Sequence, residues 1–183
     1  MTPDDVRLRP LTAADWPAVH DWAKLPESST YQGWGPNTEE QTREYCKQTA
    51  KVWKQRPQLR FAYAILLDDR VVGTADLLVR GEGQGEIGYG VHPRVWGRGI
   101  ATTVARRLLR IGFDERRLHR IYATCDPRNL ASARVLTKIG MTHEGRLRET
   151  MLIHDGWRDS DLYAILEGEW RAAVTAGEPA APG

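Results

Sequence analysis

Three apolar, β-prone runs in the middle of the chain constrain its fold most strongly. They cover residues 61–67 (FAYAILL), 71–79 (VVGTADLLV) and 86–91 (EIGYGV). Asp68 and Asp69 form a turn between the first two runs, and a glycine-rich segment separates the second from the third. Apolar runs joined by such short turns pair as antiparallel neighbours. The centre of the fold is therefore predicted to be an antiparallel β-sheet.

Helical patterns precede and follow these runs. Thr12 is followed three residues later by Asp15, and Thr38 by Gln41. A hydroxyl at the N-cap with an acid or amide three residues later is typical of a helix start. We expect helices from each start, the second ending near residue 55, with a loop over 26–37 that is rich in Pro, Gly, Ser and Asn. The remaining expected elements are strands at 6–8, 120–125, 142–153 and 159–166, and helices at 97–113 and 129–139.

This order of elements predicts a mixed α/β fold in one domain, over residues 1–173. The chain has 183 residues, enough for a single core that needs no metal or disulfide. The low-complexity segment 174–183 (VTAGEPAAPG) is expected to be disordered.

The charge balance excludes some classes of protein. Lys and Arg total 26 against 24 Asp and Glu, a net charge of +2, whereas proteins that coat nucleic acids carry a large basic excess. No apolar run approaches the roughly 18 residues of a membrane span, and the N-terminus lacks the pattern of a secretory signal. We expect a cytoplasmic monomer or homodimer with no nucleic-acid or membrane partner.

Cysteine and histidine offer little chemistry. Cys46 and Cys125 are too few for a disulfide scaffold. Cys125 closes an apolar strand, so packing is favoured over an acyl-enzyme role, which requires an activated thiolate. His92 and His143 have no partner at metal-ligand spacing, and no metal is predicted.

Seven glycines fall between positions 81 and 99, and two patterns compete within them. Residues 83–88 spell GxGxxG, the dinucleotide-binding pattern, which requires a preceding strand and a following helix. Here a strand follows, and no acid stands about 20 residues further on to bind a ribose. A flexible turn at Gly81, Gly83 and Gly85 is the favoured interpretation.

The second pattern, Arg94-x-x-Gly97-x-Gly99, lies where a strand ends and a helix begins. The first N–H groups of a helix lack intrahelical partners, and glycines let an anion approach them. Arg94 and Arg98 add full charges. An anion site is favoured over a plain turn of two glycines beside solvated arginines.

Several segments together resemble one enzyme family. Residues 94–101 (RVWGRGIA), 86–93 (EIGYGVHP) and 126–141 (DPRNLASARVLTKIGM) have the order and spacing of motifs in the GNAT superfamily of N-acetyltransferases. The Asn-x-x-Ser-x-Arg-Val-Leu form is similar to the ribosomal-protein-alanine N-acetyltransferase (RimJ/RimL-like) branch. The resemblance implies a central, mostly antiparallel twisted sheet of about seven strands flanked by about four helices. It implies transfer of an acetyl group from acetyl-CoA to a primary amine in a ternary complex; the alternative is a non-catalytic acyl-CoA-binding module.

The resemblance also implies roles for individual residues. Glu86 is expected as the general base, either directly or through water; the alternative is a surface carboxylate. Leu136 stands where many relatives carry an acidic Tyr, so Ser132 is the expected acid, or else a small residue that contacts CoA. Arg134 is expected to be solvated. The residues expected to bind the CoA donor are Val91 (through its backbone), Arg94, Gly97, Arg98, Gly99, Ile100, Ala101, Thr102, Asn129, Ser132 and Lys138.

The acceptor site is implied between the first two helices. Tyr31 and Trp34 are expected to form walls of an amine pocket, and Tyr89 to contribute from the strand; the alternative is that the aromatic residues pack as plain core. The sequence leaves a protein N-terminus, a metabolite and an amine antibiotic open as acceptors.

Overall fold

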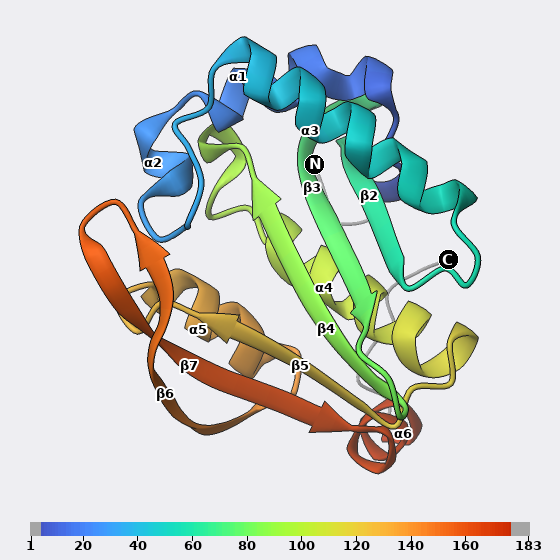
Figure 1. The fold of residues 1–183 in the computed structure, drawn as a ribbon. Coiled ribbons are helices and arrows are strands. Elements are labelled where there is room, and N and C mark those ends of the chain that lie inside the picture. Colours follow the sequence, from blue (N-terminus) through green and yellow to red (C-terminus); the bar gives the residue numbers. More distant parts are fainter. Residues whose placement is uncertain (1–4, 177–183) are drawn as a thin grey trace.

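The computed structural model describes residues 5–176, which form a seven-stranded sheet flanked by helices (Figure 1). The strand order is β1-β2-β3-β4-β5-β7-β6, and every neighbouring pair is antiparallel except β4 and β5. This confirms the predicted mixed, mostly antiparallel sheet. The strands are β1 (Val6–Pro10), β2 (Arg60–Leu67), β3 (Arg70–Val79), β4 (Gln84–Val91), β5 (Arg120–Cys125), β6 (Thr142–Ile153) and β7 (Gly156–Leu166).

The helices cover both faces of the sheet (Figure 1). Two separate apolar clusters mark the two faces: one joins β2 to α1 and α3, and the other joins the sheet to α4 and α5. The helices are α1 (Trp16–Ala23), α2 (Pro26–Ser29), α3 (Glu39–Lys51), α4 (Ile100–Arg110), α5 (Leu130–Lys138) and α6 (Glu167–Thr175).

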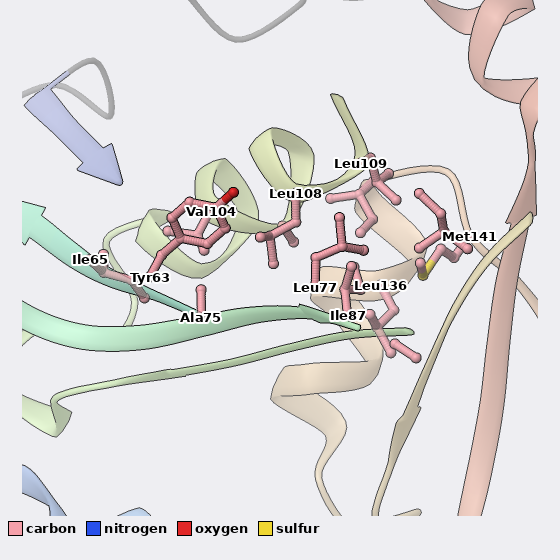
Figure 2. Close-up of a cluster of buried hydrophobic side chains, with 14 of the residues drawn as sticks. Tyr63, Ile65, Ala75, Leu77, Ile87, Val104, Leu108, Leu109, Leu136 and Met141 are labelled. Carbon is pink, nitrogen blue, oxygen red and sulfur yellow. The ribbon is translucent and has the colours of Figure 1, made fainter. Parts of the chain in front are cut away.

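The larger cluster forms between α4 and the middle strands (Figure 2). Val104 and Leu108 stand four residues apart on one face of α4, and both are fully buried. They pack over Leu77 of β3 and Ile87 of β4. This packing fixes α4, and therefore its N-terminus, against the centre of the sheet.

The parallel pair β4–β5 is short and leaves a gap. The two strands pair only over Gln84–Glu86 and Arg120–Tyr122, although β4 continues to Val91 and β5 to Cys125. Beyond this pairing the strands separate, and in Figure 1 they diverge from their shared lower end. The separation leaves an opening in the sheet, with α4 and α5 on one face and α1 on the other.

The structure corrects several predicted boundaries. The expected loop at 26–37 contains the short helix α2. Helix α4 begins at Ile100 rather than 97, because Gly97 (φ +74°) and Gly99 (φ +78°) are in the left-handed region and cannot continue a helix. More helices are present than the expected four.

Gly85 and the C-terminal segment also differ from expectation. Gly85 lies within β4 rather than in the turn, and a Cβ there would stand 2.6 Å from Leu118 Cδ1. Helix α6 was not predicted; its Trp170 stacks on Phe113 with ring centroids 5.8 Å apart. Positions 174 and 175 therefore belong to a helix, and the rest of the predicted tail, from 177 on, lies outside the described residues.

Two absences hold for residues 5–176. No helix there has the length and apolar character needed to cross a membrane. No group of three or more His, Cys, Asp or Glu side chains in the same residues could hold a metal ion.

The predicted capping box at Thr12 depends on Asp15, and this predicts a pH effect on stability. Asp15 accepts hydrogen bonds from the Thr12 backbone at 2.8 Å and from two Arg9 nitrogens at 2.6 and 2.7 Å. Burial alone would raise the Asp15 pKa, but the bonds from Arg9 and Thr12 outweigh it and lower the pKa. Its contribution to the free energy of unfolding is therefore present above the unfolded-state pKa and lost as the pH falls through the folded-state pKa. In urea titrations across acidic pH, Asp15→Asn should lose less stability on acidification than the wild type; equal losses would contradict this.

Candidate functional site

A cavity of about 1140 Å³ lies along residues 88–91 of β4, which are beyond the part of this strand that pairs with β5. Residues 88–91 of β4 line its middle. One end, here called the glycine-loop end, is formed by residues 96–102 and by residues of α5 with the segment before it. The other, the aromatic end, is lined by residues including Trp22, Tyr31, Trp34 and Tyr45. One continuous space therefore joins a helix N-terminus to an aromatic pocket.

The glycine-loop end has the geometry of an anion site. Gly99 is the N-cap of α4, and the first bond closing a turn of this helix runs from Thr103 N–H to Gly99 O at 3.0 Å. The N–H groups of the three preceding residues therefore have no intrahelical partner. A Cβ placed on Gly97 or Gly99 would meet nothing within 4 Å, so the loop faces open space. The Trp96 indole donates to Val91 O at 2.9 Å and fixes the loop to β4.

Arg94 departs from the expectation for this loop. Its side chain does not line the cavity but turns to α1, where Nη1 lies 3.3 Å from Asp21 Oδ2. The cause is the 3-10 turn Pro93–Val95, at which the His92 ring accepts a hydrogen bond from the Arg94 backbone N–H. Arg134, expected to be solvated, lines the cavity instead.

Helix α5 and strand β4 each bring one hydroxyl to the cavity, Ser132 and Tyr89. Asn129 caps the helix, its Oδ1 accepting from Ser132 N–H at 3.0 Å. The Ser132 hydroxyl lies 3.5 Å from the Tyr89 hydroxyl across the gap, and both residues line the cavity. Burial raises the Tyr89 pKa to about 12. Tyr89 therefore stays protonated at neutral pH. Leu136, which stands where many relatives carry a Tyr, is buried in the core.

Glu86, expected as the base, is not among the cavity-lining residues. Its Oε2 accepts from Arg80 Nε at 2.8 Å and Nη2 at 2.5 Å, and the Tyr122 hydroxyl lies 3.4 Å away. This pairing favours the alternative interpretation of a surface carboxylate. Asp76 of β3, which the sequence reasoning missed, does line the cavity. A charged residue inside the apolar run 71–79 was the available sign.

The aromatic end contains the two residues predicted for it and two more. Trp34 packs edge to face on Trp22, with ring centroids 5.7 Å apart. The centroid of the Tyr31 ring lies 5.9 Å from the guanidinium carbon of Arg128. Trp22 and Tyr45 were not predicted, because their places on α1 and α3 do not reveal which helix face meets the gap.

Cys125 is buried at the end of β5. Burial first, and then the charge of Asp161, raise the pKa of its thiol to about 11. The thiol is therefore protonated at neutral pH, which argues for packing rather than nucleophilic chemistry.

Comparison with known proteins identifies the family. The family model described as "Acetyltransferase (GNAT) domain" matches residues 5–142. This chain belongs to the GNAT acetyltransferase family. It is thus an N-acetyltransferase, and the expected non-catalytic alternative is not favoured.

Individual relatives agree over nearly the whole chain. The uncharacterized N-acetyltransferase YnaD of Bacillus subtilis is 33% identical over 164 residues, covering 89% of this chain and 94% of YnaD. The crystal structure of a GNAT-family acetyltransferase from Bacillus anthracis is 33% identical, covers 90% of this chain and 96% of its own, and has a TM-score of 0.77. RimJ of Mycobacterium smegmatis, solved in complex with CoA-disulfide, is 26% identical, covers 94% and 89%, and has a TM-score of 0.81.

Proposed function

We propose that this protein transfers the acetyl group of acetyl-CoA to a primary amine while both substrates occupy the single cavity. The observation that carries the proposal is that cavity: it joins an anion-suited helix N-terminus to an aromatic pocket along the part of β4 that does not pair with β5. A donor with a pyrophosphate at one end and a thioester at the other suits such a space. The CoA-disulfide bound to the Mycobacterium smegmatis relative supports the choice of donor.

At the glycine-loop end, backbone groups do most of the binding. The N–H groups of Ile100, Ala101 and Thr102, together with Gly97 and Gly99, receive the pyrophosphate, and the helix dipole adds partial positive charge. Cationic side chains near the same end add attraction to the phosphates: Arg98, Arg134 and Lys138 line the cavity. Asn129 contacts the arm of the donor and keeps its capping bond.

The chemical step requires three things of this chain. An acceptor that binds as an ammonium must first release a proton to solvent, because only the free amine can attack the thioester carbonyl. Negative charge that develops on the carbonyl oxygen requires a fixed donor, for which the Val91 backbone is the proposed group. The C–N bond forms as the C–S bond breaks, the nitrogen loses a proton to solvent, and the departing sulfur takes one from Ser132. The Tyr89 hydroxyl can replenish the Ser132 proton across the 3.5 Å contact and is itself reprotonated from solvent. Because a thiol has a pKa near 8.5, this help is modest.

The acceptor belongs to the aromatic end, where Tyr31 and Trp34 line the walls. One relative, from Escherichia coli, is named as a ribosomal protein uS5-alanine N-acetyltransferase and is 27% identical over 106 residues, 56% of this chain. A protein or peptide N-terminus is therefore one acceptor to test beside small amines.

The test is release of CoA thiol from acetyl-CoA in the presence of three acceptors: a short peptide beginning with alanine, phenethylamine and spermidine. We expect turnover with at least one of them, above the hydrolysis measured without amine. Mass spectrometry should show one added acetyl group on the amine nitrogen. Binding of acetyl-CoA without turnover of any of the three would contradict the proposal and favour a binding module.

A further inference from the structure

The aromatic end carries a charged pair that the chemical step above does not use. Among the described residues that line the cavity, the carboxylates are Asp76 and Glu27. Glu27 is exposed on the short helix α2, whereas the Asp76 side chain is only 19% exposed and lies on β3. Asp76 is therefore the carboxylate held within the cavity.

The sheet register directs Asp76 into open space. Asp76 pairs with Gly88 of β4, and side chains of directly paired residues stand on the same face about 5 Å apart. Gly88 has no side chain, and a Cβ built there would meet nothing within 4 Å. The space beside the carboxylate is therefore left for a ligand.

Arg60 fixes the Asp76 carboxylate. Arg60 Nε, on the neighbouring strand β2, donates to Asp76 Oδ1 at 2.7 Å. The contact is to Oδ1, and it is the Asp76 ion pair that the described part of the chain shows. The pair holds the Asp76 carboxylate in one orientation, and a carboxylate has more than one acceptor site to offer a cation.

Two further polar atoms at the same end are buried and lack partners. Trp22 Nε1 and Ser28 Oγ have no hydrogen-bond partner among the described residues, although both residues line the cavity. Trp22 is 4% exposed, so its unpaired N–H is costly unless a ligand receives it. These two atoms are a second observation, independent of Asp76, of polar groups on cavity-lining residues that a polar ligand could engage.

We propose that Asp76 binds the cationic amine of the acceptor and selects acceptors with one ammonium group on an apolar body. The Trp22–Trp34 pair supplies the apolar and cation–π surface beside it. The guanidinium of Arg60 disfavours a second positive charge nearby. The proposal rests on the proposed function, since it names a residue for the acceptor of that reaction.

The test compares Asp76→Asn with the wild type, using whichever amine of the three the wild type acetylates fastest. Asparagine has the same shape and keeps an oxygen for Arg60 Nε, so the sheet should be retained. The KM for the amine should rise at least about tenfold, as expected for loss of a charged hydrogen bond. The KM for acetyl-CoA and the melting temperature should stay unchanged, and the wild type should prefer phenethylamine over spermidine.

Two further variants separate the outcomes. Asp69→Asn makes the same chemical change in the β2–β3 turn, at a left-handed residue (φ +61°) that asparagine tolerates, and should behave as the wild type. Glu86→Gln changes the carboxylate that sequence reasoning preferred. A wild-type amine KM in Asp76→Asn, or a larger rise in Glu86→Gln, overturns the inference while the proposed function stands. Preference for spermidine overturns the stated acceptor class, and absence of turnover in the wild type is the separate failure of the proposed function.

Discussion

Gly99→Glu should weaken acetyl-CoA binding by at least about 100-fold, because it places a carboxylate at the N-terminus of α4. Gly99 caps the helix and faces open space that the proposed pyrophosphate occupies. The new side chain both fills that space and repels the anion. Isothermal titration with acetyl-CoA measures the effect directly, and unchanged affinity would refute the assignment of the loop.

Gly81→Glu is the matched control for this change. Gly81 has the same φ of +78°, and a Cβ there also meets nothing within 4 Å, but it lies in the β3–β4 turn. Both variants therefore carry the same left-handed strain of about 1–2 kcal/mol. Only Gly99→Glu should lose affinity for acetyl-CoA, and a similar loss in both would assign the effect to strain.

Leu108→Ala should lower the free energy of unfolding by about 2–5 kcal/mol, the range for deleting a buried leucine side chain. Leu108 is fully buried in the last turn of α4, within the apolar cluster that includes Leu77 and Ile87 (Figure 2). The change leaves a cavity where the helix meets the sheet. Chemical denaturation with urea measures this change in the free energy of unfolding.

Leu59→Ala provides the comparison, because Leu59 is 52% exposed just before β2. Its loss should be within about 0.5 kcal/mol. Equal losses of unfolding free energy in the two variants would contradict the packing of α4 on the sheet that Figure 2 shows.

Local patterns predicted the strands well. β2 and β3 were recognisable because their apolar runs flank a two-Asp turn, and both Asp68 (φ +49°) and Asp69 (φ +61°) have the left-handed backbone that such a turn requires. The start of α4 was placed three residues early, because helical spacing alone does not show which glycine interrupts the helix. Helix α6 is short, with nine residues, and its last two residues fall in the segment expected to be disordered.

The site was harder to predict because it depends on contacts between distant residues. Glu86 had the right residue type and motif position, but Arg80 binds its carboxylate outside the cavity. Arg94 was assigned to the loop, but its side chain pairs with Asp21, 73 positions earlier in the chain. Asp76 stood out in the sequence as a charge within an apolar run, but its place beside the cavity follows from the register that sets it opposite Gly88. Such contacts depend on the tertiary structure, and the spacing of residues within one segment cannot predict them.

The two ends of the cavity are drawn from different parts of the chain. Residues 88–138 supply the glycine-loop end and the strand between the ends, whereas Trp22, Trp34 and Asp76 come from the first 76 positions. If the acceptor binds at the aromatic end as proposed, substitutions or insertions at 26–37 alter the acceptor side without touching the helix N-terminus. A lineage with this architecture can diverge in what it acetylates while keeping one donor, and exchange of the N-terminal segment alone is a practical route to new acceptor specificity.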